Sequence, residues 1–150
     1  MEYEALTGQI IQVYYKVYNE LGYGFTESVY HNAMILALTN AGLAVETERP
    51  IAVHYDGQVV GTFSVDLVVE GTIMLELKAK ESLHPAHEAQ LTNYLRATDI
   101  EVGLLLNFGK KPEFKRKYFS NANKKGMNIE ERSALSYLLE EVPPLSQEQA

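Results

Sequence analysis

The chain has 150 residues, of which 46% are hydrophobic and 22% are charged, a composition typical of an ordinary globular domain. It has no cysteine, which excludes disulfides, thiol catalysis and cysteine-ligated metal sites, and its net charge of −7 argues against a general polyanion binder. No apolar run is long enough to span a membrane and the acidic start has no signal-peptide pattern, so we expect a cytoplasmic protein without a membrane partner. We expect one domain over residues 1–142 and a mobile tail over residues 143–150.

Two helices are predicted before the first strand. Apolar residues recur at spacings of three or four, which predicts an amphipathic helix over residues 3–21. These apolar residues are Leu6, Ile10, Val13, Val17 and Leu21. A second helix is predicted over residues 26–41, with Thr26 as its N-cap and Gly42 as its stop signal. Glu27 lies in the first turn of this helix, where the helix dipole favours a carboxylate whatever the protein does.

An antiparallel pair of strands is predicted next. Residues 45–49 are extended, Pro50 marks a break or an edge position, and residues 51–55 alternate as a strand. Asp56 and Gly57 form the strongest short-range hairpin signal in the chain, so the following residues should return beside the first strand.

The most informative stretch is a second hairpin with charges inside apolar strands. Residues 65–69 and 73–77 are β-branched and aliphatic, and Glu70 and Gly71 between them signal a turn. If the loop takes three residues, Asp66 falls directly opposite Glu76, with Cβ atoms about 4.5–5.5 Å apart.

Lys78 shares the strand face of Glu76, because side chains alternate along a strand. Two neighbouring carboxylates repel unless a proton or a cation lies between them, and carboxylate oxygens are suitable ligands for a hard divalent ion. The alternative is that these charges form the solvated face of an antiparallel sheet.

Pro85 begins a third predicted helix, which ends near Thr98. His87, Gln90 and Tyr94 share one face of it, at spacings of three and four. Gln90 and Tyr94 could bind a phosphate or orient a catalytic group, or they could be amphipathic residues at the rim of an apolar stripe.

A buried strand and a basic segment follow. Residues 102–108 form a continuous apolar run that favours a strand in parallel pairing after the helical crossover. Seven of the 13 basic residues lie within residues 110–125, with Glu113 as the single acid there. With its interleaved aromatic residues this segment could follow a phosphate backbone, or it could be an edge strand that lysines protect from aggregation. A last short helix is predicted over residues 129–139.

The predicted order is a helix, three antiparallel strands, a helix and a strand, with the acid, acid and lysine on the second and third strands. This resembles the PD-(D/E)xK nuclease superfamily and implies a mixed α/β (α+β) sheet with an αβββαβ core, extended by helices at both ends. Residues 24–30, with Gly24, Glu27 and Tyr30, resemble the motif that names the GxxExxY family within it. Val65 stands where the superfamily name expects proline, which is not a ligand.

The resemblance implies a metal-dependent nuclease acting on DNA or RNA. Asp66, Glu76 and the backbone carbonyl of Leu77 would bind Mg²⁺ or Mn²⁺, Glu27 would complete that site or support its ligands, and Lys78 would position the attacking water.

Two further sets of residues follow from this hypothesis. Gln90 and Tyr94 match a glutamine and tyrosine motif that supports the active site in RecB-like members. The expected phosphate contacts are Lys110, Lys111, Lys115, Arg116 and Lys117. The competing hypothesis is an inactive nuclease-fold module that binds nucleic acid or a partner protein. A homodimer is compatible with either hypothesis.

Overall fold

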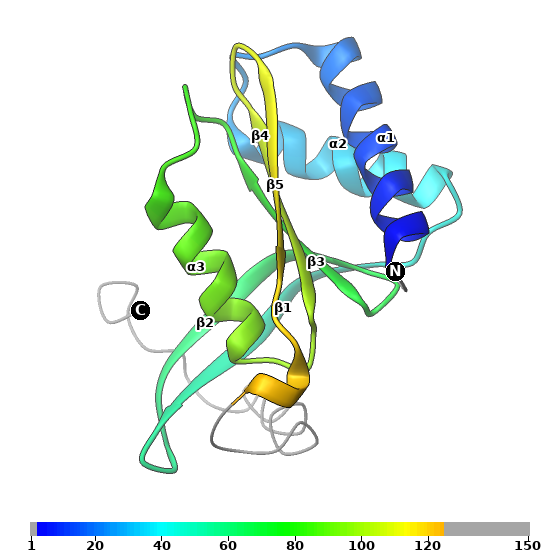
Figure 1. Ribbon diagram of the computed structural model, residues 1–150. Coiled ribbons are helices and arrows are strands. Elements are labelled where there is room, and N and C mark those ends of the chain that lie inside the picture. Colours follow the sequence, from blue (N-terminus) through cyan, green and yellow to red (C-terminus); the bar gives the residue numbers. More distant parts are fainter. Residues whose placement is uncertain (1–2, 125–150) are drawn as a thin grey trace.

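The computed structural model describes residues 3–124 (Figure 1). The elements in chain order are α1 (Glu4–Leu21), α2 (Glu27–Asn40), β1 (Val45–Tyr55), β2 (Gln58–Val69), β3 (Ile73–Lys78), α3 (Pro85–Arg96), β4 (Val102–Phe108), β5 (Pro112–Tyr118) and a 3₁₀ turn (Asn121–Asn123). The helix predicted over residues 129–139 and the tail over residues 143–150 lie outside the described residues. Within residues 3–124, no helix is long and apolar enough to cross a membrane.

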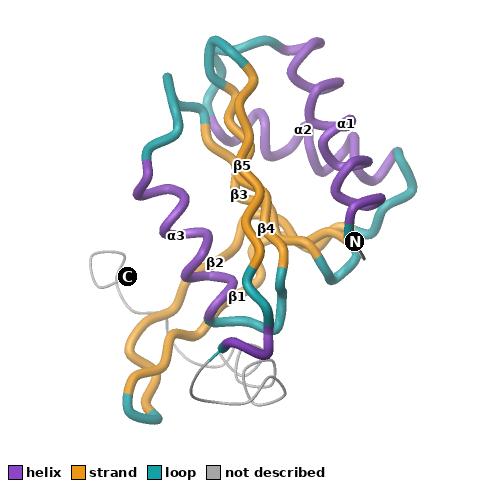
Figure 2. Tube along the Cα trace, viewed as in Figure 1, coloured by secondary structure: helices purple, strands orange, loops and turns teal. Residues whose placement is uncertain are grey.

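The five strands form one sheet in the order β1-β2-β3-β4-β5. The β3/β4 pair is parallel and the other neighbours are antiparallel, as the helical crossover through α3 requires. Helices α1 and α2 cover one face of the sheet and α3 covers the other (Figure 2). The predicted αβββαβ order is confirmed in α2 to β4, and α1 and β5 flank this core.

Tyr14 ties α1 to the far strands of the sheet. Its hydroxyl donates to the carbonyl of Asn107 in β4 and accepts from the N–H of Glu113 in β5 at 3.0 Å. Its ring is fully buried and lies edge-on to Phe108, with centroids 5.0 Å apart. The ring of Tyr30 from α2 is stacked on Phe108, with centroids 4.2 Å apart. These aromatic contacts fix both helices on one face of the sheet.

Of the two alternatives for Pro50, the edge position is confirmed and the break is not, because β1 runs unbroken through Pro50 and joins residues 45–49 to 51–55. A proline is tolerated there since β1 is an edge strand of the sheet. Thr26 does precede α2, but its side chain does not cap the helix and its hydroxyl lies 3.0 Å from that of Ser28. The Asp56 and Gly57 hairpin is confirmed, with both residues at positive φ as a two-residue turn requires.

The β1–β2 hairpin extends beyond the rest of the sheet as a two-stranded arm (Figure 1). β2 pairs with β3 only over residues 67–69, so the remainder of β2 has β1 as its strand neighbour. Helix α3 packs against the arm, where the rings of Phe63 and Tyr94 lie 5.2 Å apart. The point where β2 leaves β3 is where the charged residues of the sequence gather.

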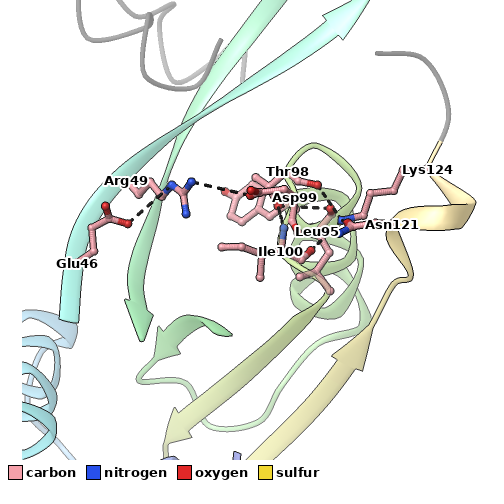
Figure 3. A network of polar contacts seen from close by, with 9 residues as sticks. Glu46, Arg49, Leu95, Thr98, Asp99, Ile100, Asn121 and Lys124 are labelled. Carbon is pink, nitrogen blue, oxygen red and sulfur yellow. Dashed lines mark hydrogen bonds and ion pairs between the residues drawn. The ribbon is translucent and has the colours of Figure 1, made fainter. Parts of the chain in front are cut away.

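A polar network fixes the loop between α3 and β4 (Figure 3). The ammonium of Lys124 donates to the carbonyls of Thr98 and Ile100 at 2.7 and 2.8 Å. From the other side, Arg49 of β1 approaches the carboxylate of Asp99 at 3.9 Å. The loop is thus held by both the arm and the end of the described chain, which fixes the C-terminal end of α3.

Candidate active site

The candidate site lies where β2 separates from β3. Backbone pairing between these strands ends at Leu67 and Leu75, so Leu77 lies beyond the paired part of the ladder. The Leu77 N–H donates instead to Oδ2 of Asp66 at 2.8 Å. In return, Oε1 of Glu76 accepts the Asp66 N–H at 3.1 Å. The three-residue loop and the facing positions of Asp66 and Glu76 are therefore as predicted.

Glu76 is the most buried carboxylate of this group, with a relative exposure of 6%. Burial, followed by the negative charge of Asp66, raises the pKa of Glu76 to about 8, although the positive charge of Lys78 opposes both effects. Near neutral pH this pair of carboxylates accordingly retains a proton or takes up a cation. The solvated-face alternative does not fit a carboxylate buried to this degree.

Helix α3 brings two of the predicted residues to the same face of the sheet. Tyr94 is buried, and burial followed by the charges of Glu76 and Asp66 raises its pKa, so its hydroxyl stays protonated beside the carboxylate pair. Gln90 lies one turn earlier on the same helix face and is half-buried. Lys78, at the end of β3, is also half-buried and its charge acts on Glu76.

Sequence reasoning missed His31 and Glu48, which lie on the other side of Asp66. One ligand atom from each of the three residues lies within 4.8 Å of the others. Nε2 of His31 is 3.7 Å from Oε1 of Glu48 and 3.2 Å from the backbone carbonyl of Asp66. Glu48 has a φ of 52°, an uncommon conformation for a residue other than glycine. The sequence gives no signal for this pairing, because a register shift between Val53 and His54 moves the β1–β2 pairing by one residue and so brings Glu48 level with Asp66.

The residues around Asp66 fit a divalent cation. Asp66 and Glu76 supply carboxylate oxygens, which suit Mg²⁺ and Mn²⁺, and burial makes their mutual repulsion costly without a neutralising partner. His31 adds an imidazole nitrogen next to Asp66, a ligand type that favours Mn²⁺ and later transition metals over Mg²⁺.

Two histidines form the N-terminal cap of α3. Nδ1 of His84 accepts the N–H of Ala86 at 3.0 Å, and Nδ1 of His87 accepts the N–H of His84 at 3.1 Å. Burial and the charges of Lys78, His84 and Lys80 lower the pKa of His87, while the charge of Glu27 opposes them. Glu27 is therefore close enough to act on the α3 N-terminus, but it is exposed and is not part of the His31, Glu48 and Asp66 group.

The basic segment forms β5, an edge strand with cations on both faces. Lys115 and Lys117 pair with residues that face α3, and Lys117 forms an ion pair with Glu88 of that helix at 2.7 Å. Arg116 pairs with Leu104, which faces α1 and α2. Lys110 and Lys111 are exposed in the turn before β5. Only part of the predicted phosphate-binding set therefore lies on one surface.

Comparisons with known proteins agree with the fold. Residues 4–117 match the model of the family described as the PD-(D/E)XK nuclease superfamily. The chain is similar in fold to a solved protein described as "Crystal structure of SSO0001", with a TM-score of 0.50 and 18% identity. That match covers 77% of this chain and 59% of the other, so this chain spans less than two thirds of its length. No curated protein matches the chain in sequence. Because the family match covers most of the sequence, the chain belongs to the PD-(D/E)XK nuclease superfamily.

Proposed function

We propose that this protein is a metal-dependent nuclease that hydrolyses phosphodiester bonds of DNA or RNA. The main support is the buried carboxylate of Glu76 in contact with Asp66, with Lys78 two residues later on the same strand face. The superfamily match supports a nuclease fold, and the Gly24, Glu27 and Tyr30 pattern supports membership of the GxxExxY family.

Asp66, Glu76 and the carbonyl of Leu77 would hold the cation, Mg²⁺ or Mn²⁺. His31 and Glu48 are close enough to Asp66 to take part in the same group. When bound, such a cation lowers the pKa of a bound water and neutralises charge that develops on a phosphate.

The chain's own groups then have separate tasks. The ammonium of Lys78 donates hydrogen bonds to the attacking water and holds it in line with the phosphate. The hydroxyl of Tyr94 and the amide of Gln90 orient these groups from α3, and Tyr94 is a donor because its pKa is raised. Glu27 lies at the start of α2 and supports the site from its rim.

A nuclease also has to bind the phosphates on either side of the bond that it cuts, and positively charged side chains provide this binding. Lys110 and Lys111 lie exposed in the β4–β5 turn, and the exposed Lys115 follows on the face of β5 that meets α3. Each such contact contributes affinity that falls as salt rises.

The test is cleavage of end-labelled DNA and RNA, single-stranded and duplex, with Mg²⁺ or Mn²⁺ and with chelator. We expect metal-dependent cleavage by the wild type and a loss of about 100-fold or more for Glu76→Gln and Lys78→Ala. Lys16→Ala, which removes an exposed lysine of α1, is the matched control and should cleave like the wild type. Salt-sensitive binding without cleavage under either metal would instead identify an inactive nuclease-fold module.

A further inference from the structure

The loop between α1 and α2 exposes two aromatic side chains. Tyr23 is 56% exposed and Phe25 is 50% exposed, with only one residue between them. Gly22 and Gly24, on either side of Tyr23, have φ values of 70° and 108°, which side chains with a Cβ rarely adopt. The two glycines thus permit the loop conformation in which Tyr23 and Phe25 lie at the surface.

This loop is held in place by Tyr30. The Tyr30 hydroxyl donates to the carbonyl of Gly22 at 2.7 Å and accepts the N–H of Phe25 at 3.2 Å. The edge of the Phe25 ring also contacts Tyr30, with centroids 6.1 Å apart, and Tyr30 is stacked on Phe108 in the core. These contacts of Tyr30 therefore hold the loop that carries the exposed rings. The loop loses little conformational entropy when a planar aromatic ligand binds to the rings.

A basic turn lies beside the loop. The hydroxyl of Tyr18 contacts the carbonyls of Gly109 and Lys110 at 2.6 and 2.7 Å, which joins the end of α1 to the β4–β5 turn. The N–H of Gly22, the residue directly before Tyr23, donates to the carbonyl of the same Tyr18 at 2.7 Å. Figure 1 shows the α1–α2 loop and the β4–β5 turn at one end of the sheet.

The Phe25 end of the α1–α2 loop lies towards the candidate active site. Phe25 is two residues before Glu27, whose charge acts on His87 at the start of α3. Tyr30, which is hydrogen-bonded to this loop, is stacked on Phe108, the last residue of β4, so the loop lies by the carboxyl end of that strand. In sheets with parallel strands, ligands bind beyond the carboxyl ends of those strands, and β3 and β4 are the parallel pair here.

We propose that Tyr23 and Phe25 form a stacking platform for unpaired bases of a single nucleic-acid strand whose phosphates lie along Lys110 and Lys111. This inference rests on the proposed function and names its substrate class. Bases in a single strand have free faces that stack on aromatic rings whatever their sequence, whereas bases in a duplex already stack on one another. The exposed lysines of the neighbouring β4–β5 turn match a polyanion rather than an apolar protein surface.

The test measures binding by the full chain with chelator, so that no strand is cut. The probes are a fluorescent single strand of about 12 thymidines, an abasic strand of equal length and a duplex of equal length. We expect Tyr23→Ala and Phe25→Ala each to weaken binding of the thymidine strand by about 5- to 100-fold and to leave the abasic strand unaffected. Tyr23→Phe keeps the ring and should bind like the wild type.

Tyr55 provides the control, because it is 75% exposed at the far end of the arm and Tyr55→Ala should not change any affinity. Lys110→Ala should weaken binding of the normal and abasic strands alike and reduce the salt dependence. Thermal melts check that Phe25→Ala is folded, and Tyr23→Ala tests the platform independently of that outcome. Equal affinities of Tyr23→Ala and wild type for the thymidine strand would overturn the platform.

Cleavage with Mn²⁺ separates this inference from the proposed function. Ring-dependent binding without cleavage by the wild type would support the platform and contradict the nuclease. Cleavage of duplex and single strand at equal rates, unaffected by Tyr23→Ala, would support the nuclease and contradict the platform.

Discussion

Asp66 and Glu76 each stabilise the backbone of the strand opposite their own. Oδ2 of Asp66 accepts the Leu77 N–H at 2.8 Å, and Oε1 of Glu76 accepts the Asp66 N–H at 3.1 Å. The carboxylates thereby satisfy main-chain donors where the ladder between β2 and β3 ends. The same two groups are the leading candidates to hold a metal, so their structural and functional roles are coupled.

This coupling predicts a pH-dependent stability in the metal-free protein. Burial and then the charge of Asp66 raise the pKa of Glu76 from 4.5 to about 8. The folded protein therefore favours the protonated form of Glu76. Protonated Glu76 contributes its full stability below the ordinary pKa of 4.5, and this stability is lost as the pH rises through about 8. Thermal melts with chelator from about pH 5 to about pH 8.5 should show a fall in Tm that is smaller in Glu76→Gln.

At about pH 8.5, Mn²⁺ should raise the Tm of the wild type towards its value at about pH 5, because the cation replaces the proton between the carboxylates. Glu76→Gln should gain little from Mn²⁺. Melting curves of the two proteins that shift in parallel with pH would contradict the raised pKa.

Metal binding can be tested without a substrate. Titration calorimetry of Mn²⁺ should show binding by the wild type and none by Asp66→Asn, because Asp66 belongs to both ligand groups around it. His31→Gln should weaken Mn²⁺ binding by about 10-fold and Mg²⁺ binding less, since imidazole suits Mn²⁺ better. His54→Gln changes a histidine of the arm and serves as control. Unchanged Mn²⁺ affinity in His31→Gln would remove His31 from the site.

Sequence patterns were sufficient to predict the core of the site, because strand alternation and a three-residue turn are local. The turn of Glu70 and Gly71 places Asp66 across from Glu76, and that register is confirmed. The apolar stripe of the third helix is also confirmed, because Leu91 and Leu95 of α3 lie in the core.

The missed part of the site depends on contacts between distant elements. His31 reaches Asp66 only because α2 packs against the sheet at that position, and no spacing within α2 reveals it. The basic segment was found from composition, but composition does not show how its cations are distributed. In the structure Arg116 and Lys117 lie on different faces of β5, because side chains alternate along a strand. Similarly, nothing local distinguished the rigid loop of Tyr23 and Phe25 from an ordinary turn.

The histidine cap of α3 predicts a loss of helix stability in acid. Both Nδ1 atoms accept backbone N–H groups, and protonation of an imidazole removes its acceptor nitrogen. The pKa of His87 is lowered below 6.5, so the contribution of the cap is complete above the ordinary value and is lost as the pH falls through the folded pKa. Hydrogen exchange of the α3 amides should therefore speed up between about pH 7.5 and about pH 5, after correction for the intrinsic rate.

His87→Gln gives the matched control, because glutamine at this helix position is a standard capping residue that does not titrate. His84→Ser likewise supplies a conventional N-cap. The double variant should show the same α3 protection at both pH values. An equal acid response in the double variant and the wild type would mean that another group controls the helix end.

Asn107 and Gly109 hold the loop that follows Lys78. The buried amide of Asn107 accepts the Lys80 N–H and donates to the Lys80 carbonyl, both at 2.9 Å. Asn107→Ala should therefore leave two backbone groups without partners and cost about 1–3 kcal/mol of unfolding free energy, measured by urea titration. A Cβ on Gly109 would lie 2.3 Å from the Lys80 carbonyl oxygen, so Gly109→Ala has to displace this loop.

Gly109→Ala should reduce cleavage more than Asn107→Ala does at equal stability, because it moves the backbone next to Lys78 rather than only loosening it. Gly61→Ala is the control, since a Cβ there meets no atom within 4 Å. It changes a glycine of the arm and should leave cleavage unchanged. Wild-type cleavage rates in Gly109→Ala would show that the position of the loop does not set the position of the Lys78 ammonium.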